Sequence, residues 1–332
     1  MSEPPTGYDT AVEAAATIDR SLRTRLRVRG RAPAQMLNGI LTGTLPAAPI
    51  PAPGGVRCGT ATYHAVLTPK GKMITDLWCL RLGDEEGDGF LLDIPPAGRE
   101  GLIANLSRFL PPRMANAEDV TATTRMITVV GPSAASLLSR LALGLRVEAH
   151  ELSGLAEGAW RAYGPSAPDG LVVTRTCDVW PEAFNVTGPS AVVTALANGL
   201  AVAGVPTADA DVWTTLRVEA GRPEYGVDMD DDTIPVEADI HERAIDYEKG
   251  CYTGQEVIVR IRDRGHVNRS LRLLHLGDLQ PPPRGTELFE VEAPAGVRPV
   301  GVVTSAVHSP KHGETLALAY LKRGIEGPVA PR

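Results

Sequence analysis

The spacing of hydrophobic residues alternates along the chain between the period of a helix and the period of a strand. Apolar residues at helical spacing predict helices over 9–20, 33–41, 96–109, 190–204 and 254–264. Alternating or short continuous apolar runs predict strands over 22–30, 58–67, 72–82, 90–94 and 125–130. The arginines that alternate with apolar residues in 22–30 are expected to form a solvated face.

A β-hairpin is predicted over 57–82. Its turn, Thr68-Pro69-Lys70-Gly71, has proline and glycine where a type I turn favours them. Asp76 interrupts the otherwise apolar second strand. A buried carboxylate there needs a partner or a ligand, whereas an aspartate pointing outward from an edge strand needs neither. The pattern leaves both interpretations open.

The last part of the chain changes character after about residue 270. Short apolar runs are separated by turn-forming segments at 281–285, 294–296 and 309–313. This pattern predicts a small antiparallel β module, which we expect to close into a barrel.

Composition and charge narrow the class of protein. The 332 residues carry a net charge of −7, which argues against a general nucleic-acid binder. The chain begins with an acidic segment that lacks an apolar core, and no run of about 18 apolar residues occurs. Its four cysteines are widely spaced and are expected to be reduced thiols. We expect a soluble, cytoplasmic monomer without direct contact to nucleic acid or membrane.

The stretch 248–256 holds the strongest candidate for chemistry. Thr253 and Glu256 have the spacing of a capping box for a helix over 254–264, with Gly265 as its stop. A cysteine such as Cys251, just before a helix N-terminus and close to Lys249, is favoured as a thiolate. The structural alternative is a small buried residue in a turn.

A cluster of arginines follows this cysteine on an otherwise acidic protein. It consists of Arg260, Arg262, Arg264, Arg269 and Arg272. The cluster is either a salt-bridged surface or a docking site for a polyanionic ligand. The acidic segment 228–232 is interpreted as a solvated turn rather than a metal site, so no metal ligands are predicted.

The segment KGCYTGQE at 249–256 resembles the signature of the YgfZ-type folate-binding proteins. These belong to the superfamily of the glycine-cleavage T-protein, a tetrahydrofolate-dependent aminomethyltransferase. Four further segments resemble T-protein segments in the same order: GKMITDL at 71–77, RVEAG at 217–221 with Tyr225-Gly226, GVVTS at 301–305 and ALAY at 317–320.

The resemblance implies an α+β fold of three modules in a ring around a central hole that holds folate. The first module is expected to combine 1–30 with 122–230, and the second 31–121 with 231–268. The third, 269–332, would be the antiparallel β-barrel.

The resemblance also implies a folate site. Asp76 falls where the T-protein has the aspartate that contacts the pteridine region and serves its chemistry, and Tyr63 and Glu219 match folate-site residues. A carboxylate suits the N–H edge of a pterin, and a tyrosine supplies stacking area and a polar tip. We add Arg175 and Arg260 as expected folate contacts, the latter for the glutamate tail.

Departures from the T-protein pattern point to a different role. Leu22 stands in place of a histidine, Thr75 in place of one of two paired aspartates, and 175–181 lacks the glycine-rich segment. The resemblance therefore implies a tetrahydrofolate-binding accessory protein that uses Cys251, Lys249 and Asp76 to support iron–sulfur cluster assembly or repair. Its partners would be apoproteins or assembly factors, including those behind tRNA thiolation. The alternative is a folate-dependent one-carbon transferase in which Asp76 positions the folate nitrogen.

Overall fold

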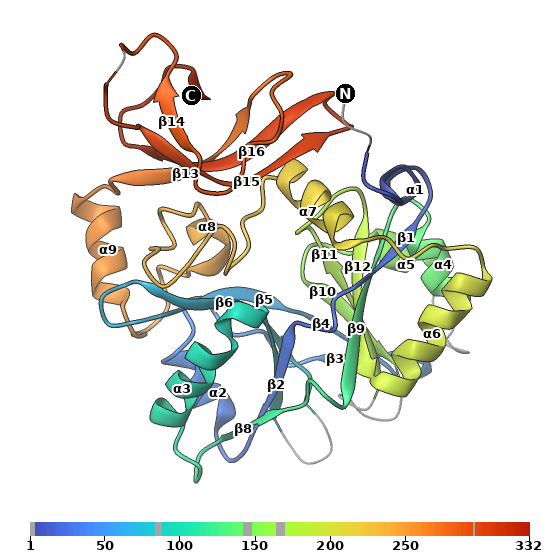
Figure 1. Ribbon diagram of the computed structural model, residues 1–332. Coiled ribbons are helices and arrows are strands. Elements are labelled where there is room, and N and C mark those ends of the chain that lie inside the picture. Colours follow the sequence, from blue (N-terminus) through green and yellow to red (C-terminus); the bar gives the residue numbers. More distant parts are fainter. Residues whose placement is uncertain (1–3, 84–87, 142–147, 164–169, 295) are drawn as a thin grey trace.

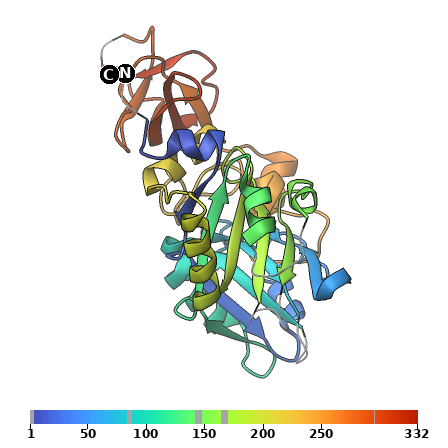
Figure 2. The same ribbon diagram turned by 90° about the vertical axis from the view of Figure 1, so that its right-hand side faces the viewer.

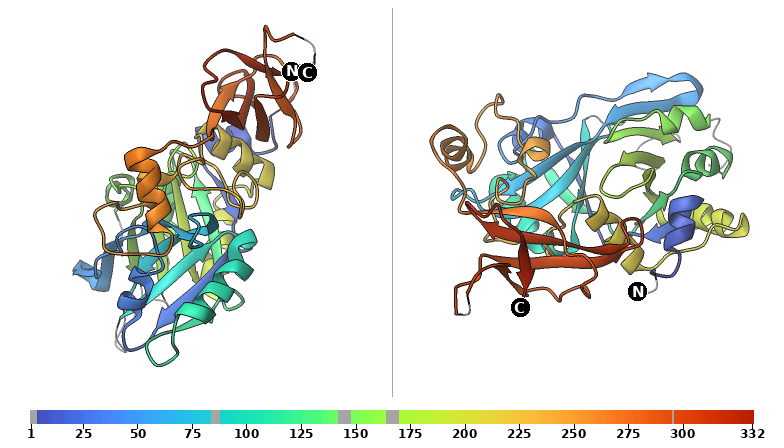
Figure 3. Two further views of the ribbon diagram at one scale, coloured as in Figure 1. Left: turned by 90° about the vertical axis from the view of Figure 1, so that its left-hand side faces the viewer. Right: turned by 90° about the horizontal axis from the view of Figure 1, so that it is seen from above.

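Three antiparallel sheets form the framework of the protein. The computed structural model describes residues 4–83, 88–141, 148–163, 170–294 and 296–332. A seven-stranded sheet and a central five-stranded sheet lie next to each other, and the five-stranded C-terminal sheet lies across one end of the pair (Figure 1). The turned views in Figures 2 and 3 show the C-terminal sheet projecting from the body formed by the other two.

The strands follow each other in space as follows. The seven-stranded sheet has the order β1 (Ala16–Asp19), β9 (Thr124–Val130), β12 (Ala183–Pro189), β11 (Leu171–Thr176), β10 (Ala159–Tyr163), β4 (Val56–Thr60) and β3 (Ile50–Ala52). The central five-stranded sheet has the order β5 (Thr62–Leu67), β6 (Met73–Arg81), β7 (Gly89–Ile94), β2 (Thr24–Arg29) and β8 (Asn116–Asp119). The C-terminal sheet has the order β13 (Arg269–His275), β16 (Glu314–Lys322), β15 (Gly301–Ser309), β14 (Glu287–Glu290) and β17 (Val329–Pro331).

Helices cover the outer faces of the sheets and connect them. They are α1 (Tyr8–Glu13), α2 (Pro33–Asn38), α3 (Arg99–Phe109), α4 (Ala134–Leu141), α5 (Ala149–Ser153), α6 (Ser190–Val202), α7 (Ala210–Glu219), α8 (His241–Ala244) and α9 (Gln255–Arg264). Apolar side chains of α4 and α6 bury themselves on the seven-stranded sheet, and those of α3 on the central one. No helix among the described residues is both long and apolar enough to span a membrane.

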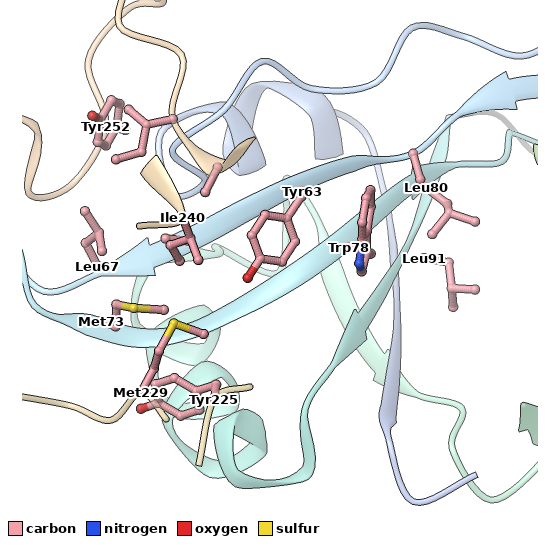
Figure 4. Packing of buried hydrophobic residues seen from close by; sticks show 14 of the residues in the cluster. Tyr63, Leu67, Met73, Trp78, Leu80, Leu91, Tyr225, Met229, Ile240 and Tyr252 are labelled. Atoms are coloured by element: carbon pink, nitrogen blue, oxygen red, sulfur yellow. The ribbon is translucent and has the colours of Figure 1, made fainter. Parts of the chain in front are cut away.

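One apolar cluster joins the central sheet to the segment between α7 and α9. Tyr63 and Trp78 project from neighbouring strands β5 and β6. Ile240 lies beside Tyr63, and Tyr225 and Met229 lie together near Met73 (Figure 4). Because this cluster draws on sequence positions far apart, burial of its apolar surface fixes the segment 225–258 against the hairpin.

Several predicted elements are confirmed, and three local predictions are wrong. The helix over 96–109, the strands over 90–94 and 125–130, and the turn at 68–71 are present. The predicted helix over 9–20 ends at Glu13, because β1 pairs with β9 instead. The predicted strand 58–67 breaks at Ala61: its first half joins the seven-stranded sheet and its second half the central one.

The third wrong prediction concerns the arginine face of β2. Arg25 is fully buried, and its guanidinium donates to the carbonyls of Arg23, Thr121 and Thr124. These backbone acceptors replace the water that a solvated arginine would bind.

The C-terminal module is an antiparallel sheet, as expected, but its closure into a barrel is not observed. Its outer strands β13 and β17 do not pair with each other within the described part of the chain. The expected division into modules stays a prediction. The strand pairing differs from this division at two places. β2 was expected in the first module but lies in the central sheet, and β3 and β4 were expected in the second module but lie in the seven-stranded sheet.

Candidate functional site

Asp76 and Tyr63 form the centre of the candidate site. They lie on neighbouring strands of the hairpin, where Asp76 pairs with Ala65 and Tyr63 with Trp78. The Tyr63 hydroxyl donates a hydrogen bond of 2.5 Å to Oδ2 of Asp76. The other carboxylate oxygen, Oδ1, is buried and has no hydrogen-bond partner among the described residues. An unsatisfied buried carboxylate oxygen costs free energy unless a ligand or water binds it.

The environment of Asp76 brings the pKa of its carboxyl group closer to neutral pH. Its side chain is buried, with 6% of the residue exposed. Burial raises the pKa of Asp76 to about 6, against the opposing hydrogen bond from Tyr63 and the positive charge of Arg23. A carboxyl group with such a pKa can accept or return a proton near neutral pH.

Aromatic and charged groups build a wall beside this carboxylate. The rings of Tyr63 and Trp78 lie 5.3 Å apart between centroids, and the Arg243 guanidinium lies 4.7 Å from the Tyr63 centroid. Asp178 accepts hydrogen bonds from Arg243 at 2.9 Å and from the Trp78 indole at 3.3 Å. Burial alone raises the pKa of Asp178, but the Arg243 guanidinium brings it below its ordinary value. The pKa values of Asp76 and Asp178 are therefore shifted in opposite directions within one site, as in many acid–base sites.

A small cavity lies among these side chains. Its lining comprises Arg20, Arg23, Tyr63, Asp76, Trp78, Pro95, Asp178, Trp213, Arg217, Arg222, Pro223, Glu224 and Arg243. The cavity measures about 30 Å³. That is roughly the volume of one water molecule in the liquid. A ring-sized ligand therefore requires some lining side chains to move.

Unsatisfied polar atoms gather at this cavity. Five buried atoms of its lining have no hydrogen-bond partner among the described residues: Oδ1 of Asp76, Nε1 of Trp213, and Nε of Arg20, Arg217 and Arg243. Because buried polar groups in folded proteins are almost always paired, this concentration indicates a site built for a polar ligand.

Glu219 does not line this cavity. Its carboxylate accepts hydrogen bonds from the hydroxyls of Tyr8 at 2.9 Å and Ser309 at 2.5 Å, and from the Trp180 indole at 2.7 Å. The partners come from α1, β15 and the loop after β11, so Glu219 ties these elements together. A carboxylate that accepts this many bonds has little capacity left for a ligand.

Arg175 and Arg260 also lie outside the cavity lining. The Arg175 guanidinium donates to the carbonyls of Thr176 and Ala183 within its own sheet. Arg260 is exposed on α9 and pairs with Glu256 at 3.2 Å, one helical turn away.

Three members of the arginine cluster, Arg262, Arg269 and Arg272, line a separate cavity of about 500 Å³ with Arg323. The structure therefore divides the predicted cluster between this cavity and the exposed surface of α9. Arg262 and Arg269 are paired there with Asp263 and Glu237.

The Lys249–Glu256 segment is built differently from its prediction. Helix α9 is present, but Gly254, not Thr253, precedes it, and no side chain caps it. Gly254 has φ +86°, and a Cβ there would approach the Thr68 carbonyl oxygen to 2.7 Å. The predicted capping box is therefore wrong, because close packing on the 68–71 turn requires a glycine at the helix start.

The two reactive side chains of this segment point to different environments. Nζ of Lys249 donates to the carbonyls of Leu41 at 2.8 Å and Gly43 at 2.7 Å, and burial lowers its pKa to about 8. Cys251 is exposed and does not line the Asp76 cavity. Among the described residues, no group of three or more His, Cys, Asp or Glu side chains is placed to hold a metal ion.

Arg20, Arg222, Arg243 and Asp178 are site residues that sequence reasoning missed. Arg20 and Asp178 lie inside the two segments that depart from the T-protein pattern, and this was the available signal. Arg222 lies between RVEAG at 217–221 and Tyr225-Gly226, a segment that resembles the T-protein, whereas Arg243 had no distinguishing sequence context.

Comparisons with known proteins identify the family of this chain. The model of the GCVT N-terminal domain matches residues 7–249. The chain is 30% identical over 326 residues to an aminomethyltransferase of Corynebacterium jeikeium, covering 93% of this chain and 79% of that protein. It is 30% identical over 270 residues to an aminomethyltransferase of Rubrobacter xylanophilus, covering 81% and 68%.

A solved structure shows the same fold. The glycine cleavage system aminomethyltransferase T from Bartonella henselae superposes with a TM-score of 0.77 at 21% identity, covering 95% of this chain and 80% of that one. The family model matches nearly three quarters of the sequence, and an aminomethyltransferase is 30% identical over most of its length, so the chain belongs to the GCVT family.

Proposed function

We propose that the protein binds tetrahydrofolate in the Asp76 cavity and catalyses a folate-dependent one-carbon transfer. The observation that carries this proposal is the buried Asp76 carboxylate, which has one oxygen held by Tyr63 and the other unsatisfied. Family membership supports it, since aminomethyltransferases use tetrahydrofolate as the one-carbon carrier.

The residues present suit a reduced pterin. Oδ1 of Asp76 can accept a hydrogen bond from a ring N–H, and the Tyr63 and Trp78 rings offer apolar surface beside it. Tetrahydrofolate supplies the nitrogen that takes up the one-carbon unit. Asp76 serves as the proton acceptor at that nitrogen, because its raised pKa places it near the working range of a general base.

The Asp178–Arg243 pair positions this wall. Arg243 also pairs with Glu157 and lies over both Tyr63 and Trp78. It therefore restrains the two rings and, through the Tyr63 hydroxyl, the orientation of Asp76. This places Asp178 and Arg243 as positioning residues.

The placement among YgfZ-type proteins rests on the KGCYTGQE segment, and the iron–sulfur role would rest on Cys251. Neither the fold nor the relatives support the iron–sulfur role, and the exposed thiol lies outside the cavity lining. The transferase, which was the alternative from sequence, is the better supported function.

Two measurements test the proposal. Titration calorimetry should show tetrahydrofolate binding to the wild type, and a lipoyl carrier loaded with an aminomethyl group should transfer its one-carbon unit to tetrahydrofolate. Replacing Asp76 by Asn should lower turnover about 10²- to 10⁴-fold. The matched control Asp263→Asn alters an exposed aspartate and should leave turnover unchanged. Absence of tetrahydrofolate binding by the wild type would refute the folate site, and binding without turnover would refute the transferase with this donor.

A further inference from the structure

The charges around the Asp76 cavity are unevenly matched. Three of its arginines have a carboxylate at hydrogen-bonding distance: Arg23 with Asp93 at 2.7 Å, Arg217 with Asp228 at 2.6 Å, and Arg243 with Asp178 at 2.9 Å. Two more, Arg20 and Arg222, line the same cavity without such a partner. Whatever binds there meets two incompletely paired guanidinium groups.

Arg20 is held in place by contacts that leave its donors open. Its side chain is 13% exposed and lies flat on the Trp213 ring, with the guanidinium carbon 3.6 Å from the centroid. Its Nε is buried without a hydrogen-bond partner, and its one ion-pair partner among the described residues, Glu224, lies at 3.5 Å. Burial lowers the pKa of Arg20 to about 10, because removal from water disfavours the charged guanidinium.

Arg222 presents the other open donors. Its Nε donates to the Cys177 carbonyl at 3.2 Å. Its two terminal nitrogens have no hydrogen-bond or ion-pair partner among the described residues. The Cys177 carbonyl thus holds Nε of Arg222 and leaves the two terminal nitrogens available to a ligand.

Glu224 is a weak ion-pair partner for Arg20. It lies 3.5 Å from both Arg20 and Arg217, so one carboxylate is shared between two guanidinium groups at a distance longer than a charged hydrogen bond. Its own backbone N–H donates to Asp228 at 3.0 Å, which fixes its position on the rim.

We propose that Arg20 and Arg222 form a carboxylate-binding subsite of the Asp76 cavity. A carboxylate matches the planar, two-pronged donor edge of arginine, and binding in a partly dehydrated site strengthens the pair. The inference rests on the proposed function for the rest of the ligand. The carboxylate belongs either to the glutamate tail of the folate or to a small amino acid bound beside the pterin, for which dimethylglycine serves as the probe.

Three ligands separate these sources by calorimetric titration. Tetrahydrofolate carries ring and carboxylates, 6-methyltetrahydropterin carries the ring alone, and dimethylglycine, added to protein saturated with that pterin, carries the carboxylate alone. The proteins are wild type, Arg20→Gln, Arg222→Gln and the control Arg260→Gln, whose arginine is exposed and paired on α9. Because Arg20 also packs on Trp213, Arg222→Gln keeps the test valid if Arg20→Gln is unstable.

A charged hydrogen bond corresponds to a loss of about tenfold or more in affinity. If the tail is the source, both cavity variants should bind tetrahydrofolate about tenfold more weakly and the pterin unchanged. If the amino acid is the source, the wild type should bind dimethylglycine, and both variants should lose it. Equal affinities of all four proteins for every ligand would overturn the subsite. Failure of the wild type to bind either the pterin or tetrahydrofolate would instead overturn the proposed folate site.

Discussion

The Asp76 cavity and the Lys249–Glu256 segment differ in how their polar groups are satisfied. At the cavity, a buried carboxylate oxygen and several guanidinium nitrogens lack partners. In the segment, Lys249 donates to two carbonyls, Gly254 packs against the Thr68 carbonyl, and Cys251 is exposed. The Tyr252 hydroxyl is the one buried side-chain atom of the segment without a hydrogen-bond partner among the described residues, against five at the cavity. The segment has the more distinctive sequence, but the cavity has most of the unsatisfied polar atoms.

The contacts of the Lys249–Glu256 segment indicate that it supports the β5–β6 hairpin. Gly71, in the turn between β5 and β6, would bring a Cβ within 2.9 Å of Val257 on α9, so helix and turn are in close contact. Lys249 fixes the 41–43 backbone, and the Gly43 N–H donates to the buried His64 of β5 at 3.0 Å. The Lys249–Glu256 segment thus supports the hairpin that carries Tyr63 and Asp76.

The largest change in stability is expected where the cavity meets the C-terminal sheet. Asp228 is buried, pairs with Arg217 and accepts hydrogen bonds from Thr304 and Ser305 on β15. Replacing Asp228 by Ala leaves a buried arginine without its partner and should lower the free energy of unfolding by about 3–5 kcal/mol. Urea unfolding at neutral pH measures it. A loss below about 1 kcal/mol would show that the pair does not hold the modules together.

The raised pKa of Asp76 predicts a pH-dependent stability that is specific to the cavity. The pKa of about 6 in the folded protein lies above the ordinary value of 3.8, so the stabilising contribution is full below pH 4 and is lost as pH rises through 6. The loss amounts to about 3 kcal/mol. The difference in unfolding free energy between wild type and Asp76→Asn should therefore change across pH 4–7. A constant difference would contradict the raised pKa.

The supporting role of the Lys249–Glu256 segment can be tested at Lys249. Lys249→Met keeps the apolar stem but removes the donors to Leu41 and Gly43, and should lower the free energy of unfolding by about 1–3 kcal/mol. If Lys249 acts as a support, turnover per folded molecule stays near that of the wild type. A large loss of turnover at unchanged stability would assign Lys249 to the chemistry instead.

The smallest effect is expected at Cys251. The thiol is exposed, so Cys251→Ala should change the free energy of unfolding by less than about 0.5 kcal/mol. One-carbon transfer should continue at the wild-type rate. If activity of iron–sulfur enzymes in cells falls with this variant while one-carbon transfer persists, the thiol has a second role apart from the cavity.

The sequence was most informative where local signals and tertiary structure agree. The turn at 68–71 and the Asp76 strand follow from proline, glycine and apolar spacing. The resemblance assigned Tyr63 and Asp76 to one folate site, and the two side chains share a hydrogen bond. Sequence reasoning failed where long-range pairing decides. Residues 16–19 form β1 because β9 and the Pro206 carbonyl complete their hydrogen bonds.

The cationic part of the site could not be predicted for the same reason. Arg20 and Arg222 lie in segments that were compared with the T-protein, but nothing local shows that they meet Arg243 at one cavity. Glu219 shows the converse limit. Its motif position matched a ligand residue, but Tyr8, Trp180 and Ser309 occupy its carboxylate in this chain.

The most direct test of the contrast between cavity and segment is calorimetric titration of tetrahydrofolate into wild type, Asp76→Asn and Cys251→Ala at pH 7.5. We expect the wild type and Cys251→Ala to bind with the same affinity, and Asp76→Asn to bind at least tenfold more weakly. Undiminished binding by Asp76→Asn together with loss of binding by Cys251→Ala would contradict the account and place the ligand at the Lys249–Glu256 segment.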